Sequence, residues 1–441
     1  MRRWLFPKLD LTGDVRRTFR FHLAYALLDA VCGGVLLNVP FVALREIGGQ
    51  NWQLPLRDGC AGVGMLASLY LGGWMASRRK MPFVFVPGLL AGCCSLAMVV
   101  ALAAGDAFWF QMLFGLGSIF ELITRPAIAA ILRQNYPVAH RARITASVRQ
   151  WASLAFAVSL MASACGLSLA GGHARMVAGA ELVGGASLGL AAFVCFRRIR
   201  PHEESVAAVR HAFRLEIFKN FHNAVEIVTH DARYRRHLLG CLIENFFNLL
   251  GLSLLAALLS KTLGYGYLGC AMLMHGLPTL AAFATTGFLG RWFDRESPWI
   301  SWAAMRLAFG LDAWLLAAAA TVAGWLPPIV LPLLMAGRLL RGGAQGGWWI
   351  LWWQIGITHF APPGENTSRY AAIMTFLYGL TRLAASLVGI GLAVWNVAPS
   401  TLLWIGGAGV MFSGVYSLVQ SRREQRQHGP RTFAEFEARF N

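Results

Sequence analysis

Apolar runs of about 20 residues or more recur along nearly the whole chain, and they constrain its fold more than any other feature. Within a bilayer only a helix, or a closed barrel, satisfies the hydrogen bonds of its own backbone. Charged residues make up 14% of the chain, whereas soluble domains average about 25%. The sequence therefore predicts an all-α membrane protein with about twelve transmembrane helices.

The net charge of +18 would favour nucleic-acid binding in a soluble protein, but the basic residues are distributed unevenly about the predicted spans. With the N-terminus placed inside, the inner segments hold most of the Lys and Arg residues. The outer segments hold Arg45, Arg57, Arg175 and Lys261. This asymmetry follows the positive-inside rule and predicts that both termini are cytoplasmic. We expect no nucleic-acid partner.

A short basic turn between two apolar runs occurs twice, half a chain apart. Each copy has a glycine, a polar residue four positions on and then an arginine: Gly73, Ser77 and Arg78 first, then Gly290, Asp294 and Arg295. The two glycines are 217 positions apart. His22 and Asp29 likewise match His237 and Glu244, both at a separation of 215 positions. A repeat at half-length is typical of transporters built from two similar halves.

The predicted architecture is two pseudo-symmetric six-helix bundles. We expect a basic cytoplasmic arm at 1–20, a first bundle at 21–196, a cytoplasmic linker with an amphipathic helix at 197–236, a second bundle at 237–419 and a cytoplasmic tail at 420–441. The first-half spans are Phe21–Leu44, Arg57–Ala76, Pro82–Ala104, Ala107–Leu132, Ile144–Ala170 and Met176–Phe196. The second-half spans are His237–Leu259, Tyr267–Phe288, Trp299–Ala323, Pro328–Gly356, Arg369–Trp395 and Ser400–Val419.

Six plus six spans, inner termini, a long central inner loop and the repeated Gly-x-x-x-Asp-Arg-type turn together resemble the major facilitator superfamily. The resemblance covers about residues 20–420. It implies that the turn braces a closed gate; Ser77 stands where the family usually has Asp, whereas Asp294 matches. Leu334–Gly342 looks like the family's Leu-x-x-x-Arg-x-x-x-Gly signature, here in the tenth span rather than the fourth. The fifth span lacks the Gly-Pro signature of drug/proton antiporters, which disfavours a drug exporter.

Charged residues inside the spans indicate the candidate site, because each costs roughly 3 kcal/mol at the bilayer centre. The resemblance implies that spans 1, 4, 7 and 10 line a central cavity. Six charged residues lie on those spans: Asp29, Glu121, Arg125, Glu244, Arg338 and Arg341. Others lie elsewhere: Arg149, Glu181, Arg306, Asp312 and Arg382. We expect Arg306, on a peripheral span and not aligned with Asp312, to extend toward the inner surface.

Two interpretations stay open for the acidic residues. Glu121 and Arg125, four positions apart, form either a self-neutralised pair or a cavity pair that substrate or a proton breaks. Asp29 and Glu244 either bind a proton or substrate, or fix helix packing through hydrogen bonds. Asn245 and Asn248 add polar groups beside Glu244 and favour a site there.

The arginines of the second half also have two interpretations. Arg338, Arg341 and Arg382 either contact an anionic substrate, since guanidinium matches carboxylate and phosphate geometry, or pair with Asp29, Glu121 or Glu244. The glycines of Gly342–Gly347 are expected to allow close helix packing. The tryptophans beside them are expected to serve mainly packing or the membrane interface, with one or two available to stack on substrate: Trp348, Trp349, Trp352 and Trp353.

No metal-ligand spacing, Walker sequence or nucleophile triad is present, so we expect no catalytic residue, metal or cofactor. We interpret the chain as a secondary active transporter of the bacterial plasma membrane, moving a small polar or anionic organic solute by alternating access. The expected partners are that solute, protons as the coupling ion and membrane lipids, and the expected state is a monomer. The alternatives are efflux of amphipathic compounds, lipid flipping, or a non-transporting sensor or assembly protein on the same fold.

Overall fold

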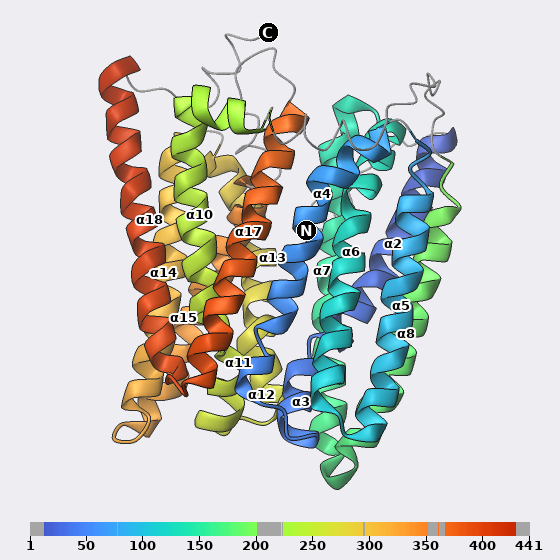
Figure 1. The fold of residues 1–441 in the computed structure, drawn as a ribbon, viewed down its shortest axis with the longest axis vertical. Coiled ribbons are helices and arrows are strands. Elements are labelled where there is room, and N and C mark those ends of the chain that lie inside the picture. The colour runs from blue at the N-terminus through green and yellow to red at the C-terminus, as the bar shows by residue number, and fades with distance from the viewer. Residues whose placement is uncertain are drawn as a thin grey trace. The chain divides into compact units, whose positions relative to one another are not determined.

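The computed structural model describes residues 13–76, 78–200, 222, 224–293, 296–351, 360 and 367–428. These residues form helices joined by turns and loops, and they contain no strand. The chain divides into two compact units (Figure 1). Unit 1 comprises the described residues of Met1–Phe218 together with Gly266–Ala271, and unit 2 those of Lys219–Tyr265 and Met272–Asn441.

Unit 1 is a bundle of long helices with four short helical segments at their ends. The long helices are α2 (Gly13–Leu36), α4 (Leu56–Ala76), α5 (Pro82–Ala104), α6 (Ala107–Asn135), α7 (Val138–Leu169) and α8 (Ala174–Arg197). Shorter helices are α3 (Val39–Glu46), η1 (Asn51–Gln53), η2 (Gly171–His173) and, from later in the chain, α12 (Tyr267–Ala271).

Unit 2 repeats this plan. Its long helices are α10 (Ala232–Leu252), α13 (Leu277–Phe293), α14 (Pro298–Val322), α15 (Pro327–Ile350), α17 (Thr367–Val394) and α18 (Pro399–His428). Its short segments are α11 (Leu255–Ala257) and two π-helical turns, η3 (Leu258–Thr262) and η4 (Met272–Gly276).

Ten helices among the described residues are long and apolar enough to cross a membrane. The remaining two long helices, α4 and α15, have 21 and 24 residues and are long enough to span. The predicted third span is confirmed at both ends: α5 has Pro82 in its first turn, and Gly105 ends it with a positive φ of 76°.

The first helix of each unit is broken, which the sequence analysis did not predict. A turn at 37–38 separates α2 from α3, and a turn at 253–254 separates α10 from α11, so the predicted continuous spans Phe21–Leu44 and His237–Leu259 are wrong in this respect. Pro40 lies in the first turn of α3, and Ser253 donates its hydroxyl to the carbonyl of Leu250 at 2.7 Å. Pro40 has no backbone N–H to donate to a preceding turn, and the Ser253 hydroxyl competes for a backbone carbonyl; both disfavour a continuous helix.

Several helices extend beyond the predicted spans. α7 begins at Val138, inside the segment predicted to be the loop Arg133–Arg143, and α18 continues past Val419 to His428. In the predicted linker, 224–230 is helical and Asp231 caps α10 by accepting from the backbone of Arg233 and Tyr234. The rest of the predicted amphipathic helix, 201–221 and 223, lies outside the described residues, as do 1–12 and 429–441.

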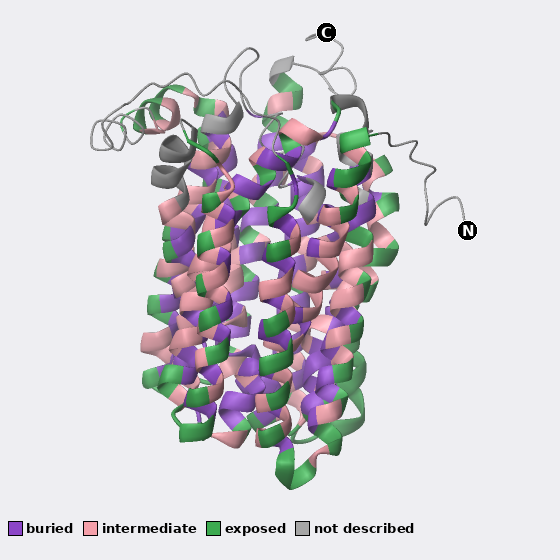
Figure 2. Ribbon diagram, turned by 90° about the vertical axis from the view of Figure 1, so that its right-hand side faces the viewer, coloured by how far each residue is buried: buried purple, intermediate pink, exposed green. Residues whose placement is uncertain are grey.

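Buried residues recur along the helices (Figure 2). Glycines let some of the helices approach closely. A Cβ on Gly342 would lie 2.3 Å from the carbonyl oxygen of Pro278, and one on Gly346 would lie 2.8 Å from that of Ala282. The predicted close packing at Gly342–Gly347 is therefore confirmed for α15 against α13. A Cβ on Gly406 would lie 2.5 Å from the Cα of Gly251, which brings α18 against α10.

Candidate functional site

In each unit, the described residues include a cluster of charged side chains that joins the middle parts of the long helices. We call Asp29, Glu121 and Arg125 the N-cluster, in unit 1. We call Glu244, Arg306, Asp312, Arg338 and Arg341 the C-cluster, in unit 2. All six charged residues predicted on spans 1, 4, 7 and 10 belong to one of the two clusters, and each contacts charged partners from its own unit.

The N-cluster joins α2 to α6 through one arginine shared by two carboxylates. Arg125 pairs with Glu121 one turn earlier on the same helix, and its Nη2 lies 3.8 Å from Asp29 Oδ2. The side chains are substantially exposed, at 25% for Asp29, 42% for Glu121 and 44% for Arg125. Two carboxylates share one guanidinium, so the cluster carries a formal charge of −1 when all three groups are ionised.

The surroundings of the N-cluster are polar on one side and tightly packed on the other. The Thr124 hydroxyl donates to the Glu121 carbonyl at 2.6 Å, and Pro126, directly after Arg125, lies inside α6 without a backbone N–H to donate. One turn before Asp29, Tyr25 is buried against Phe193 and Phe196, and no described residue forms a hydrogen bond with its hydroxyl. The cluster therefore lies at the border of the unit 1 core.

The first half of the C-cluster is a buried ion pair between α10 and α14. Arg306 Nε donates to Glu244 Oε2 at 3.1 Å, and the side chains are 0% and 2% exposed. The Trp348 indole donates to the other Glu244 oxygen at 3.0 Å. Arg306 also donates to Ser417 of α18, lies 3.1 Å from the Cys241 sulfur and stacks over Trp302. Both ions are thus enclosed and hydrogen-bonded on several sides.

The second half of the C-cluster is a bidentate pair between α14 and α15. Arg338 donates to both carboxylate oxygens of Asp312, with Nε 3.1 Å from Oδ1, and both side chains are buried. Arg341, one turn further along α15, lies 3.4 Å from the same carboxylate and donates to Asn248 Oδ1 at 3.0 Å. Its side chain is 15% exposed, the most open guanidinium of the cluster.

The placement of Arg306 and Asp312 corrects the sequence analysis. We expected a peripheral span with Arg306 extended toward the inner surface, but both side chains are fully buried. They face different partners, Glu244 on one side and Arg338 on the other, so two residues six positions apart serve two ion pairs. Arg338 accordingly pairs with Asp312, not with any of the three acids we had considered.

The other predicted residues of unit 2 take separate positions. Asn245 donates to the carbonyl of Tyr378 at 3.2 Å and to Thr381, both on α17, and so ties α10 to that helix. Arg382 is partly exposed and belongs to neither pair of the C-cluster. Cys241, Ser417 and Trp348 complete the enclosure of the first ion pair, and only Trp348 had been considered beforehand. Trp352 and Trp353, and the Trp349 side chain, lie outside what the structure describes.

The predicted gating motif is only partly visible. Gly73 lies in α4, Gly290 lies in α13, and Arg78 is exposed after the end of α4. Ser77, Asp294 and Arg295 lie outside the described residues. The role of the motif therefore stays a prediction.

The two histidines that match between the halves, His22 and His237, make similar contacts in the structure. His22 lies 3.0 Å from the hydroxyl of Tyr136, which precedes α7, while His237 stacks on Phe360, which precedes α17, with ring centroids 3.9 Å apart. In each unit, the first long helix thus places a buried histidine against an aromatic residue that precedes the fifth.

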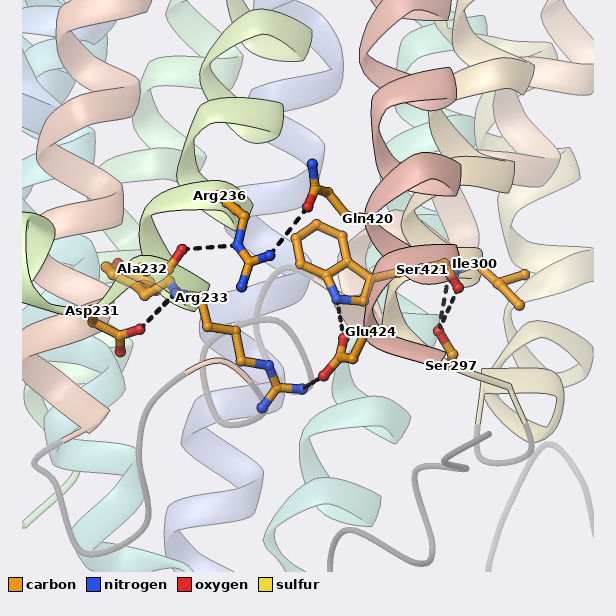
Figure 3. A network of polar contacts seen from close by, with 11 residues as sticks. Asp231, Ala232, Arg233, Arg236, Ser297, Ile300, Gln420, Ser421 and Glu424 are labelled. Atoms are coloured by element: carbon orange, nitrogen blue, oxygen red, sulfur yellow. Dashed lines mark hydrogen bonds and ion pairs between the residues drawn. The ribbon is translucent and has the colours of Figure 1, made fainter. Parts of the chain in front are cut away.

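A third polar network ties the ends of three helices together in unit 2 (Figure 3). Arg233 of α10 pairs with Glu424 of α18, which also accepts from the indole of Trp299 at the start of α14. Nearby, Arg236 reaches Gln420 at 3.5 Å, and Ser297 lies 3.5 Å from Ser421. This network holds the extension of α18 beyond the predicted end of the last span.

Comparison with known proteins agrees with this architecture. The sequence matches the family model of the Major Facilitator Superfamily over residues 22–386. A search of curated proteins found no match.

Solved structures of transporters have a similar fold. One is a bacterial homologue of the human drug peptide transporters PepT1 and PepT2, with a TM-score of 0.65, 11% identity and coverage of 94% of this chain and 99% of that one. Another is a POT family transporter in complex with 5-aminolevulinic acid, with a TM-score of 0.66, 13% identity and coverage of 93% of this chain and 96% of that one. A third is the nucleoside transporter NupG, with a TM-score of 0.59, 11% identity and coverage of 93% of this chain and 100% of that one.

Two helical bundles with charged residues at membrane depth define a multi-pass membrane protein with a transporter fold. The family match extends over most of both bundles. The chain belongs to the major facilitator superfamily.

Proposed function

We propose that the protein is a secondary active transporter that moves a small polar or anionic organic solute by alternating access. The N-cluster carries this proposal. Its three charged side chains lie well inside spans Gly13–Glu46 and Ala107–Asn135, yet are 25–44% exposed. Charged groups at membrane depth face protein or water-filled cavities rather than lipid. A hydrated charged face at this depth is what a polar solute needs in order to enter the membrane.

The preference for an anionic solute rests on the C-cluster. Its three arginines exceed its two carboxylates, so the cluster carries a formal charge of +1. Arg306 and Arg338 are enclosed by Glu244 and Asp312, whereas Arg341 shares Asp312 and is partly open. We propose Arg341 as the guanidinium that contacts a carboxylate or phosphate of the substrate.

Proton coupling rests on the excess acid of the N-cluster. When Asp29 or Glu121 is protonated, the other carboxylate and Arg125 form a simple neutral pair. A proton and the ion pairing of Arg125 therefore compete for the same carboxylates. The solved transporters of similar fold, for peptides and nucleosides, support a small organic solute as the cargo.

We place the protein in the plasma membrane of a bacterium, as a monomer, with both termini in the cytoplasm. The support for this orientation is the concentration of Lys and Arg in the predicted inner segments. The basic residues Arg78, Arg79 and Lys80, between α4 and α5, lie on the side assigned to the cytoplasm.

The proposal is tested by ligand-induced stabilisation followed by transport. The purified protein is melted in the presence of anionic, zwitterionic and neutral metabolites, because a ligand of the folded state raises the melting temperature by mass action. A stabilising compound is then offered to proteoliposomes with and without a pH gradient. Accumulation that follows the gradient supports a proton-coupled transporter. Stabilisation only by lipid headgroups would favour lipid flipping, and binding without transport would favour a sensor.

A further inference from the structure

Glu181 on α8 differs from the carboxylates of the N-cluster and the C-cluster. It lies in the span Gly171–Arg197. Asp29, Glu121, Glu244 and Asp312 all pair with arginines. Glu181 forms no ion pair with any described residue, and its one hydrogen bond comes from the Ser163 hydroxyl, at 2.6 Å. An arginine partner stabilises the ionised carboxylate and so disfavours protonation. No described arginine pairs with Glu181 and stabilises its ionised form in this way.

Glu181 ends a hydrogen-bond chain that begins at the break in the first helix. Asn38, in the turn between α2 and α3, donates from Nδ2 to Ser163 Oγ at 2.8 Å and to the Leu160 carbonyl at 3.4 Å. Ser163 on α7 then donates to Glu181 Oε2. Asn38 and Ser163 are 2% and 5% exposed. The chain therefore runs from the core of unit 1 to a partly buried carboxylate.

The chain accommodates both protonation states of Glu181. A serine hydroxyl has one proton to donate and two lone pairs to accept with. With Oγ 2.6 Å from Oε2, Ser163 can donate to an ionised Glu181, and it can accept from a protonated carboxyl after its own hydrogen rotates. Asn38 Oδ1 is buried and has no hydrogen-bond partner among the described residues. If the amide group flips, this oxygen can accept the rotated hydrogen of Ser163.

The packing leaves room for the carboxylate, and no charged side chain among the described residues pairs with it. Gly166 faces it, and a Cβ there would lie 2.9 Å from Glu181 Oε1. α8 packs against α2, α3, α5, α7 and η2. In the segments of these helices and of α8 that adjoin the α2–α3, α5–α6 and α7–α8 turns, the charged and titratable residues include Asp29, Cys32, Arg45, Glu46, Cys94, Cys165, His173 and Arg175. Within the described part of the chain, none of them bonds to Glu181.

We propose that Glu181, held by Ser163 and Asn38, is a proton-binding site of unit 1 that is distinct from the N-cluster. A proton from water forms an O–H bond on the carboxylate, and its release returns the ionised form. Use of this site for coupling rests on the proposed transport function. The binding of a proton does not, so the two can be tested apart.

The test is infrared difference spectroscopy of the full-length protein in lipid, between acidic and alkaline buffer. Wild type is expected to gain a protonated-carboxyl C=O band at acidic pH. Glu181→Gln is expected to lose one component of this band. Ser163→Ala is expected to keep that component at a shifted frequency, because the hydrogen bond to the carboxyl is removed. The readout needs no substrate, so its failure is separate from a failure of transport.

Two controls make the assignment specific. Glu121→Gln, which alters an arginine-paired carboxylate, is expected to leave the Glu181 component in place. Glu181→Asp keeps the carboxyl and is expected to move the component without removing it, which covers the case in which Glu181→Gln does not fold. An unchanged band in Glu181→Gln, or a component that stays at every pH, would overturn the proposal. Displacement of the component by Na⁺ at constant pH would also overturn it, in favour of a metal-cation site.

Discussion

Arg306 Nε lies 3.1 Å from Glu244 Oε2, and neither side chain is more than 2% exposed. The pair joins α14 to α10 inside unit 2, and Ser417, Cys241 and Trp348 make further hydrogen bonds to it. Removal of one partner leaves the other charge buried without compensation.

Glu244→Leu is therefore expected to destabilise the protein by about 3–5 kcal/mol, the usual effect of breaking a buried ion pair. The double variant Glu244→Leu/Arg306→Met is expected to recover most of that loss, because an apolar pair of similar volume needs no counter-charge. Thermal melting of the purified variants measures both. Equal melting temperatures for the single variant and wild type would show that the pair does not stabilise the fold.

Replacement of N-cluster residues is expected to have a different effect. Asp29→Asn and Glu121→Gln alter exposed charges, whose pairing contributes at most about 1 kcal/mol. Both variants are expected to melt close to wild type while changing the pH dependence of uptake. A large drop in melting temperature with unchanged pH dependence would identify the cluster as structural, which is the self-neutralised interpretation of the sequence.

Arg341→Gln tests the proposed anion contact. A hydrogen bond to a charged group contributes about 1.5–3 kcal/mol, so affinity for an anionic ligand should fall by about 10- to 100-fold. The side chain is partly open and shares Asp312 with Arg338, so folding should be little affected. Isothermal titration with the ligand found in the stabilisation screen gives the affinity. Unchanged affinity would move the contact to another cation, such as Arg382.

The close approach of α10 and α18 predicts a strong position dependence for glycine replacement. Gly406→Ala places a methyl group 2.5 Å from the Gly251 Cα and is expected to destabilise unit 2 by about 1–3 kcal/mol. Gly391→Ala on α17 is the matched control, because no atom lies within 4 Å of its added Cβ. The control is expected to be neutral or slightly stabilising, since alanine favours the helix. Similar melting temperatures for the two variants would contradict the packing described here.

The network of Figure 3 predicts that the end of α18 depends on Glu424. Glu424→Gln removes the charge that Arg233 pairs with and weakens the bond from Trp299. Amides of 417–428 are expected to exchange with deuterium several-fold faster, while those of α5 stay unchanged. Hydrogen exchange read by mass spectrometry checks this. An unchanged rate would mean that the helix holds without the network.

Local signals in the sequence predicted the helices well but not their interruptions. Pro82 and Gly105 define the ends of α5 because their backbone preferences act at single positions. Pro40 did not reveal the break at 37–38, because proline is also compatible with the first turn of a helix. The half-length repeat at His22 and His237 predicted equivalent positions, and the structure adds that each histidine contacts an aromatic residue before the fifth helix of its unit.

The charged clusters show where sequence reasoning ends. The spacing of Glu121 and Arg125 predicted their pairing, since both lie on one helical face. The partners Glu244 with Arg306 and Asp312 with Arg338 come from different helices, and their pairing depends on how those helices are rotated and offset. A single sequence contains no local signal for that. The assignment of Arg306 to a peripheral role failed for this reason.

The difference in enclosure between the two clusters has a consequence for inherited variation. Substitutions at Glu244, Arg306, Asp312 or Arg338 would reduce how much protein accumulates in the membrane, because even 1–2 kcal/mol of lost stability changes abundance several-fold. Substitutions at Asp29, Glu121 or Arg125 would leave normal amounts of an altered protein. Immunoblots of inactive alleles from a genetic screen would therefore separate the alleles by the unit in which each one lies.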